Sequence, residues 1–497
     1  MTGKHLLAID QGTTGTTALI MDVDGNTLGR ATFEFPQYFP QPGWVEHEPE
    51  EIWNSVTRAV AAALERAGFG WDAIAAIGIT NQRETTLMWD RRTGAPIHRA
   101  IVWQDRRTAD HCRELENKGF GPRVRAATGL VIDPYFSGTK VKWLLDHVAG
   151  ARARAEKGEL AFGTVDSYLV WRLTGGAAHV TDATNASRTL LMNLGSLAWD
   201  DGMCEMLGVP KAILPSIVAS AGVVGKTRGA AGIPDGIPIA GIAGDQQAAL
   251  FGQACFAQGD VKCTYGTGAF ILVNTGGEPK TSRFGLLSTV AWKTAAGTVY
   301  ALEGSSFIAG AAVQWLRDGL GIIKSAADVE ALACRVPSSE GVKFVPALAG
   351  LGAPYWDAGA RGIITGLTRG TTAAHLARAT LEAIAHQVDD LVRAMADDLG
   401  TKIRRMRVDG GAAANDLLMQ FQSDLSDVVV ERPAELESTA RGAAMLAGLG
   451  VGLFQKAEEA AGMSKVASAF RPTMESAARE RLRQDWADAV SRARSSR

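Results

Sequence analysis

The stretch Asp10-Gln11-Gly12-Thr13-Thr14-Gly15-Thr16 has a counterpart about half a chain later, Thr264-Tyr265-Gly266-Thr267-Gly268. Each stretch is followed by an apolar run, residues 18–23 and 269–273, that predicts a β-strand. Glycine lets the backbone approach an anion, and hydroxyl and N–H groups donate to its oxygens, so both stretches are candidate phosphate loops. Two such units indicate a duplicated fold whose halves each offer one loop to the same ligand. The plainer alternative is a pair of ordinary β-turns, which also favour these residues.

Predicted strands and helices alternate around these loops. Three strands near the start form a meander with a turn at Asp24-Gly25-Asn26, because these residues tolerate the positive φ of tight hairpins. The alternation indicates an α/β protein with a mainly parallel or mixed sheet. The expected elements are strands over residues 6–9, 17–23, 27–35, 74–79 and 237–242, and a helix over residues 51–67.

The clearest helix comes late in the chain. A threonine at positions 371–372 is its expected N-cap, and Gly400 is its expected stop. Residues 403–408 then predict a strand that runs into Asp409-Gly410-Gly411, and another helix is expected to begin near Asn415. A strand, a glycine-rich turn and a helix N-terminus suit a nucleotide, because free N–H groups there face the ligand.

Length and charge limit the possible classes of protein. The chain has 497 residues, more than one core usually supports, so we expect two large domains, residues 1–254 and 255–497. Its net charge of -2 and the absence of long blocks of like charge argue against a nucleic-acid partner. No uncharged apolar stretch reaches membrane-spanning length, so we expect no membrane insertion.

The cysteines and the N-terminus indicate the compartment. Five cysteines, with no C-x-x-C pair, predict neither a disulfide framework nor a structural zinc site. The apolar run at residues 6–9 is too short for the core of a signal peptide. We therefore expect a soluble, cytoplasmic protein.

The segment Gly222-Val223-Val224-Gly225-Lys226-Thr227 has the appearance of the end of a P-loop. However, Ser220 stands where the first glycine of that motif belongs. The glycines and proline of residues 228–234 do not suit the start of a helix. We therefore expect residues 222–227 to form a surface loop with no role in phosphate binding.

Asp245 is the strongest candidate for a catalytic residue. It lies with Gln246 where the predicted strand ends and a helix begins, and there the helix macrodipole favours an ionised carboxylate. Such an aspartate can accept the proton of a substrate hydroxyl and orient it toward a γ-phosphate. The alternative is an aspartate that only caps its helix.

A second polar group follows the strand predicted at residues 74–79. Arg83 and Glu84 offer donor and acceptor groups to a polyol; alternatively, they form a solvated pair of little energetic value. Trp103 and Phe270 offer apolar walls for a short carbon chain, although lone aromatic residues are more often part of a core. Asp10, beside the first loop, suits a hydrated Mg²⁺, which prefers hard oxygen ligands.

Seven motifs in order along the chain resemble those of the glycerol kinases within the FGGY family of carbohydrate kinases. The likeness runs from residue 5 to about residue 470 and implies two ribonuclease-H-like, actin-related domains with the active site in the cleft between them. It also implies the ATP-dependent phosphorylation of glycerol to sn-glycerol 3-phosphate. The motifs are residues 10–14 (DQGTT), 78–86 (GITNQRETT), 185–189 (NASRT), 241–252 (GIAGDQQAALFG), 264–268 (TYGTG), 350–357 (GLGAPYWD) and 409–411 (DGG).

The resemblance also implies roles for single residues. Asp245 matches the catalytic base, and Asp10 matches the acid near Mg²⁺. The positions that match glycerol contacts are Arg83, Glu84, Trp103, Tyr135, Asp245, Gln246 and Phe270. The positions that match nucleotide contacts are Thr13, Thr14, Thr267, Gly310, Gln314, Gly411 and Asn415. The implied partners are glycerol and MgATP, and a homodimer or homotetramer is expected because both occur in the family.

Two departures from the family pattern bear on affinity and regulation. Thr17 stands where well-known bacterial members carry an arginine near the phosphates, so this cationic contact is either missing or supplied by another residue. Gly236 stands where enterobacterial members carry the arginine that binds fructose 1,6-bisphosphate, which predicts little inhibition by that compound.

Two alternatives to a glycerol kinase follow from the same motifs. A kinase for another polyol or a ketose, such as xylulose, would share the nucleotide motifs but not Arg83, Glu84, Trp103 and Tyr135. An actin-like ATPase with no small substrate is the second alternative, and the polar residues Arg83 and Asp245 argue against it.

Overall fold

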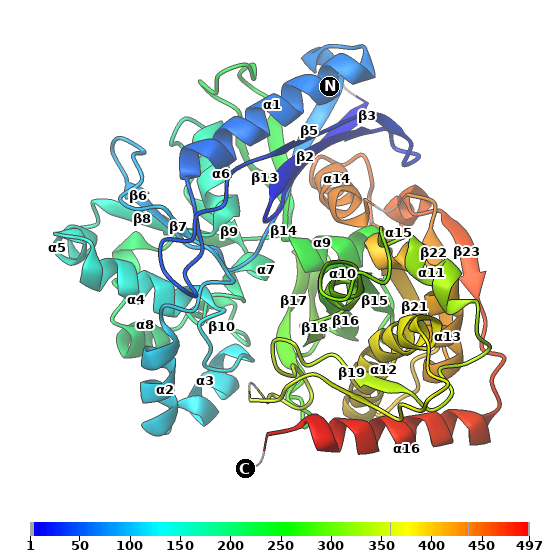
Figure 1. Cartoon of the computed structure of the whole chain (residues 1–497). Coiled ribbons are helices and arrows are strands. Elements are labelled where there is room, and N and C mark those ends of the chain that lie inside the picture. Colours follow the sequence, from blue (N-terminus) through cyan, green and yellow to red (C-terminus); the bar gives the residue numbers. More distant parts are fainter. Residues whose placement is uncertain (1–3, 358, 436, 496–497) are drawn as a thin grey trace.

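The structure is a computed structural model that describes residues 4–357, 359–435 and 437–495. It contains two large mixed sheets, which lie side by side in Figure 1. In the order of their pairing, the strands of the first sheet are β13 (Ala221–Lys226), β14 (Pro238–Gly244), β5 (Ile74–Asn81), β1 (His5–Gln11), β2 (Gly15–Met21) and β3 (Thr27–Glu34). Those of the second sheet are β17 (Leu287–Thr294), β18 (Gly297–Ser306), β16 (Ala269–Gly276), β15 (Val261–Tyr265), β21 (Arg405–Asp409), β22 (Val429–Pro433) and β23 (Val466–Phe470).

The two sheets repeat one pattern of strand pairing. In the first, β3, β2 and β1 pair antiparallel, β1, β5 and β14 pair parallel, and β13 closes the edge antiparallel. In the second, β18, β16 and β15 pair antiparallel, β15, β21 and β22 pair parallel, and β23 is antiparallel. This repetition confirms the predicted duplicated α/β fold. The first glycine- and threonine-rich loop joins β1 to β2, and the second joins β15 to β16.

Side chains of β1 alternate between two cores because successive residues of a strand point to opposite faces. Leu7 and Ile9 pack in a cluster with residues of α1 (Pro49–Ala67) and α6 (Val165–Leu173). Leu6 and Ala8 pack in another cluster with residues of α9 (Asp245–Gly252) and α14 (Ser438–Gly450). Both faces of the first sheet are therefore covered.

Helix α14 connects the two halves, since it lies between β22 and β23 of the second sheet in the chain but packs on the first sheet (Figure 1). It crosses α9 at two glycines that allow very close contact between the backbones. A Cβ added to Gly252 would lie 2.0 Å from the carbonyl oxygen of Ser438, and one added to Gly442 would lie 1.8 Å from that of Ala248. Larger residues at either glycine would push the halves apart.

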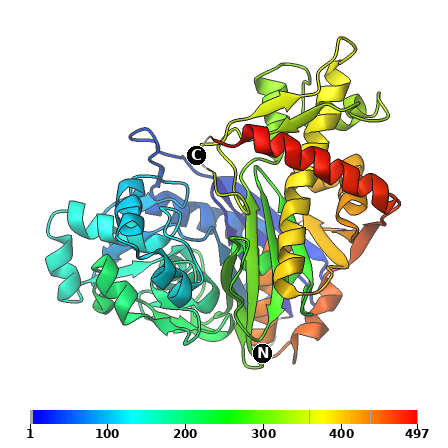
Figure 2. The same ribbon diagram turned by 90° about the horizontal axis from the view of Figure 1, so that it is seen from below.

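Around the second sheet pack α12 (Ala373–Leu399), α13 (Asp416–Ser426) and α16 (Ser476–Ala493), and Figure 2 shows α16 lying across α12. The other helices are α2 (Ala109–Asn117), α3 (Gly121–Thr128), α4 (Ser137–His147), α5 (Ala151–Glu156), α7 (Ala183–Ala186), α8 (Asp201–Leu207), α10 (Gly310–Asp318), α11 (Asp328–Ala333) and α15 (Ala457–Ala460). The 3₁₀ turns are Trp71–Ala73, Lys211–Ile213, Gly411–Ala414 and Ala461–Met463. The minor strands are β4 (Glu46–His47), β6 (Leu87–Asp90), β7 (Ala100–Ile101), β8 (Leu160–Gly163), β9 (Val180–Asp182), β10 (Met192–Asn193), β11 (Ala198–Trp199), β12 (Ser216–Val218), β19 (Lys343–Val345) and β20 (Ile363–Thr365).

Most of the elements expected from the sequence are present. Helix α12 has Thr372 as its N-cap and Gly400 in the left-handed conformation at its end, as predicted. The expected surface loop at residues 222–227 is wrong, because most of it is β13, which pairs with β14 at the sheet edge. An edge strand is paired on one side only and so tolerates the glycines that suggested a loop. Across the described ranges, no helix has the length and apolar character needed to cross a membrane.

Candidate active site

The carboxyl ends of the central strands of the first sheet bring the candidate residues of that half together. Asp10 pairs with Thr80 in the parallel register of β1 and β5, and Gly244 pairs with Asn81 in that of β14 and β5. The residues that follow each strand must therefore lie at one edge of the sheet. Those residues include Arg83 and Asp245.

Arg83 occupies the centre of the site. Its side chain is buried, and its Nη1 and Nη2 donate to Oε2 and Oε1 of Glu303 at 2.5 and 3.0 Å. Its Nε lies 3.2 Å from Oδ1 of Asp245, and its Nη2 donates to the Tyr135 hydroxyl at 3.3 Å. Because Glu303 lies on β18, Arg83 joins the two sheets, and the alternative of a solvated surface pair is wrong for this residue.

Arg188 completes a buried cluster of charges. Its Nε donates to Oε1 of Glu84 at 2.7 Å, and its Nη2 donates to Oε1 of Glu303 at 3.0 Å. Burial alone would raise the pKa of Glu303, but Arg188 and Arg83 lower it to about 2. Burial raises the pKa of Glu84, and Arg83 and Arg188 oppose the rise only in part. The two arginines therefore hold Glu303 ionised more firmly than Glu84.

Asp245 is the first residue of α9, and Gly244 occupies the N-cap position. Its Oδ1 accepts the N–H of Gln246, the next residue, at 2.7 Å. The Asp245 side chain is 31% exposed and thus open to a substrate. Burial raises its pKa, and Arg83 and Lys262 oppose the rise. Burial therefore favours the neutral form of this group, and the two cations favour the carboxylate.

Gln246 is held by a residue that the sequence analysis missed. The Nζ of Lys262, on β15 of the second sheet, donates to Oε1 of Gln246 and, at 2.7 Å, to Oγ1 of Thr264. The side chain of Lys262 is fully buried, and burial lowers its pKa. The only signal in the sequence was a lysine within an apolar strand, where a charge needs a partner.

Aromatic side chains stand beside Arg83. The rings of Trp103 and Tyr135 lie edge to face, with centroids 5.6 Å apart. Trp103 Nε1 donates to Oγ1 of Thr13 at 2.9 Å, so one wall of the site contacts the first loop. Phe270 lies near the start of β16 and is half-buried. Within the described part of the chain, neither Trp103 nor Phe270 belongs to a hydrophobic cluster, which argues against the alternative that they are core residues.

Asp10 has the properties of a ligand for a hydrated cation. Its side chain is half-buried, and its pKa is raised by burial and by the charges of Glu437 and Asp245. No cluster of three or more metal-ligating side chains exists among residues 4–357, 359–435 and 437–495. Mg²⁺ does not require one, because it binds through one or two carboxylates, water and substrate phosphates. The carboxylates of Asp10 and Asp245 therefore fit this ion.

The candidate nucleotide residues come from both halves. Thr13 and Thr14 lie in the loop between β1 and β2, and Thr267 lies in the equivalent loop between β15 and β16. The N–H of Gly310, the first residue of α10, donates to the Gly266 carbonyl oxygen at 2.9 Å, so α10 begins beside the second loop. Gln314 is exposed on the same helix.

Gly411 and Asn415 follow β21 at the same end of the second sheet. Thr264 pairs with Asp409, so the turn after β21 lies next to the second loop. Gly410 has φ of 85°, and a Cβ there would lie 2.5 Å from the carbonyl oxygen of Tyr265. Asn415 caps α13 by accepting the N–H of Leu418 at 2.8 Å. This turn therefore presents backbone and small side chains, as a phosphate or nucleotide requires.

Comparison with known proteins gives a consistent result. Residues 5–252 match the N-terminal domain, and residues 261–451 the C-terminal domain, of the FGGY family of carbohydrate kinases. The chain is similar to the glycerol kinase of Myxococcus xanthus, with 59% identity over 99% of each chain, and to glycerol kinase 2 of Thermotoga maritima, with 56% identity over 98% of each. It is also similar to the crystal structure of Plasmodium falciparum glycerol kinase with ADP, with a TM-score of 0.93, 35% identity and 98% of each chain covered.

Proposed function

The chain belongs to the FGGY family of carbohydrate kinases, and we propose that it transfers the γ-phosphoryl group of ATP to a terminal hydroxyl of glycerol, giving sn-glycerol 3-phosphate. The observation that carries the proposal is the contact of Arg83 with Asp245, Glu303 and Tyr135, beside Gln246 and Trp103. This set offers donors and acceptors to a polyol and an aromatic wall to its carbon chain. The relatives at 56–59% identity over almost the whole chain carry the name glycerol kinase.

In the proposed reaction, glycerol lies between Arg83, Glu84, Gln246 and the rings of Trp103, Tyr135 and Phe270. The carboxylate of Asp245 accepts the proton of the attacking hydroxyl. The glycerol oxygen forms a bond to the γ-phosphorus, the bond to the oxygen that bridges the β- and γ-phosphates breaks, and ADP leaves. Arg83 fixes the orientation of Asp245, because its Nε lies 3.2 Å from the carboxylate and its guanidinium is held by Glu303.

For the nucleotide, we propose contacts from Thr13, Thr14, Thr267, Gly310, Gln314, Gly411 and Asn415. Asp10, with Asp245 nearby, would hold a hydrated Mg²⁺. When bound, this ion neutralises charge on the phosphates. Trp103 links the two substrates physically, because it forms part of the polyol wall and its Nε1 donates to Thr13 in the first phosphate loop.

Three wider features stay proposals. We assign residues 1–254 to the glycerol side and the first loop, and residues 255–497 to the second loop and the adenosine side. We place the enzyme in the cytoplasm. We also expect a homodimer or homotetramer, which light scattering on purified protein would test.

A coupled assay that follows ADP tests the proposed function. The purified enzyme with MgATP would be offered glycerol, dihydroxyacetone, xylulose or no acceptor. We expect the highest kcat/KM with glycerol. Preference for xylulose would identify a kinase for another substrate of the family, and ADP release that does not depend on any acceptor would identify an actin-like ATPase.

A further inference from the structure

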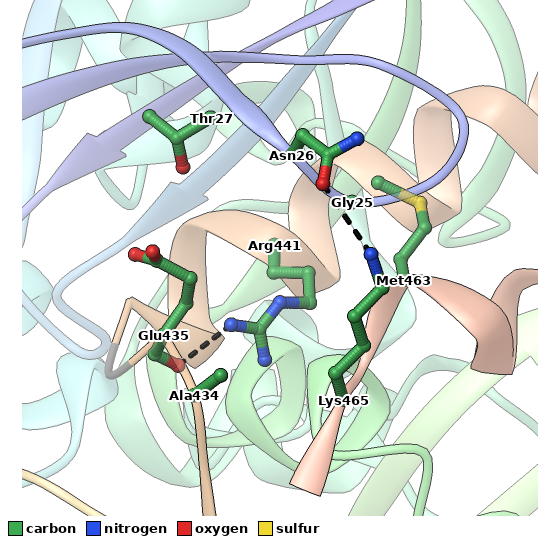
Figure 3. Close-up of a pocket in the computed structure, with 8 residues that line it drawn as sticks. All are labelled: Gly25, Asn26, Thr27, Ala434, Glu435, Arg441, Met463 and Lys465. Atoms are coloured by element: carbon green, nitrogen blue, oxygen red, sulfur yellow. Dashed lines mark hydrogen bonds between the residues drawn. The ribbon is translucent and has the colours of Figure 1, made fainter. Parts of the chain in front are cut away.

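A cavity of about 330 Å³, lined by none of the candidate active-site residues, lies where a turn of the first half meets the second half (Figure 3). From the first half come residues of the turn between β2 and β3. From the second half come Arg441 on α14 and the segments on either side of it in sequence. The lining residues are Gly25, Asn26, Thr27, Ala434, Glu435, Arg441, Met463 and Lys465.

The turn between β2 and β3 is held rigidly against the second half. Gly25 has φ of 79°, and a Cβ there would lie 2.4 Å from the carbonyl oxygen of Met463. Asn26 is fixed through its N–H and its Nδ2, each of which donates to Asp22 at 2.8 Å. Its Oδ1 therefore stays turned toward Lys465, whose Nζ donates to it at 3.3 Å.

Arg441 is the unusual residue of this cavity. Its side chain is 1% exposed, and its Nη2 donates to the Glu435 carbonyl oxygen at 2.6 Å. Its Nε and Nη1 have no hydrogen-bond partner in the described part of the chain. Burial lowers its pKa, while Glu435, Asp409 and Glu437 oppose that effect. A buried guanidinium with two free donors is costly unless an acceptor from outside the chain completes it.

The chemistry of the lining favours a phosphate group. A guanidinium presents its donors as a planar fork that matches phosphate oxygens, and Lys465 and Thr27 add an amine and a hydroxyl. Figure 3 shows Lys465 rising beside Arg441 toward Asn26, with Thr27 on the opposite wall. The carboxylate of Glu435 also lines the cavity and opposes an anion, so the charged residues of the lining are two cations and one anion.

We propose that this cavity, named here the Arg441 cavity, is a binding site for a small phosphate-bearing anion that bridges the two halves of the molecule. The inference goes beyond the proposed function, because the cavity is separate from the catalytic residues. The first phosphate loop and the turn that lines the cavity lie at opposite ends of β2, whose seven residues span about 20 Å. Bound anion would contact Thr27 of the first half and Arg441 of the second, and so stabilise their association.

Lys465 is the residue to test, because it is exposed and its replacement should leave the fold intact. Thermal unfolding would be measured with glycerol and ADP saturating the active site, while inorganic phosphate or methyl phosphate replaces chloride at constant ionic strength. We expect a saturable rise in the midpoint. Lys465→Gln should weaken phosphate binding about tenfold, because it removes one charged hydrogen bond. Glu435→Gln should strengthen phosphate binding, because it removes a negative charge from the lining.

The matched control is Lys456→Gln, which removes an exposed lysine of the same half that does not line the cavity. It should respond to phosphate as the unmodified chain does, and all three variants should phosphorylate glycerol normally. An equal phosphate response in the Lys465→Gln variant and the unmodified chain would overturn the proposal. So would an equal shift when acetate replaces chloride, since the response would then not be specific to phosphate.

Discussion

Strands β5 and β21 occupy equivalent places in the two sheets, yet the residues that follow them differ in kind. Each strand pairs in parallel with the first strand of its sheet. After β5 come Arg83 and Glu84, which are charged and buried, whereas Gly410 and Gly411 follow β21. We propose that one backbone architecture therefore serves two kinds of ligand. In this proposal, side chains bind the polyol at the end of β5, and the backbone binds the nucleotide at the end of β21.

We expect the largest effect at Asp245, because we assign the catalytic base to the first half alone. Asp245→Asn keeps the size of the side chain and an oxygen for the N–H of Gln246, but the amide does not accept the proton. We expect kcat to fall by about 10²- to 10⁴-fold. The midpoint of thermal unfolding, measured in parallel, should change little.

The matched control is Asp416→Asn, at the first residue of α13 in the second half. Asp416 is 66% exposed and pairs with Arg432 at 2.8 Å, so its replacement should cost less than about 1 kcal/mol and leave kcat unchanged. Nearly normal kcat with a lowered midpoint in the Asp245→Asn variant would instead reduce Asp245 to a structural residue.

The second prediction concerns Glu303, the carboxylate of the second half that holds both arginines of the first. Glu303→Gln leaves Arg83 and Arg188 buried with less compensating charge. We expect a loss of about 3–5 kcal/mol in the free energy of unfolding, measured with urea. Glu431→Gln, also on the second sheet and paired with Arg407 at 3.1 Å, is the control and should cost much less, because that pair is partly exposed. Equal losses of unfolding free energy in the two variants would show that the contact of Glu303 with the first half adds nothing to stability.

The pKa of Glu303 predicts that the free energy of unfolding depends on pH. The pKa of Glu303 in the folded chain is about 2, below its ordinary value of 4.5, so its contribution to stability is present above pH 4.5. That contribution is lost as pH falls toward 2. The difference in unfolding free energy between the unmodified chain and the Glu303→Gln variant should therefore shrink between pH 5 and pH 3. A constant difference across this range would contradict the assigned ionisation.

Only part of the fold and of the site can be predicted from the sequence alone. Local patterns predicted the two loops, the caps of α12 and the position of Asp245, because turns, caps and strand ends have local chemical signatures. The cluster of Arg83, Arg188 and Glu303 has no such signature, since its members are far apart in the chain and meet only when the halves pack. Strand β13 was missed for the opposite reason: its glycines suggested a loop, and its pairing with β14 decided otherwise.

The two glycines after β21 allow stability and nucleotide binding to be tested separately. Gly410→Ala forces a side chain into positive φ and against the carbonyl oxygen of Tyr265, so we expect a loss of about 1–3 kcal/mol. A Cβ on Gly411 meets nothing within 4 Å. Gly411→Ala should therefore keep the midpoint of unfolding but raise KM for ATP. An unchanged KM would argue that the nucleotide does not approach this backbone.

The smallest expected effect is at Phe270, the residue of the second half that we assign to the glycerol pocket. Phe270 is half-buried but outside the hydrophobic clusters of the described residues, so its ring is free to contact a ligand. Phe270→Ala should weaken glycerol binding by about 1 kcal/mol, because it removes apolar contact with the ring. This loss corresponds to a roughly fivefold rise in KM for glycerol, with KM for ATP unchanged. Phe284→Ala is the control, since Phe284 packs against the core of the second sheet; it should lower stability and leave KM for glycerol unchanged. If Phe270→Ala behaves like this control, the polyol pocket belongs to the first half alone, and the division of ligands between the two strand ends is stricter than we propose.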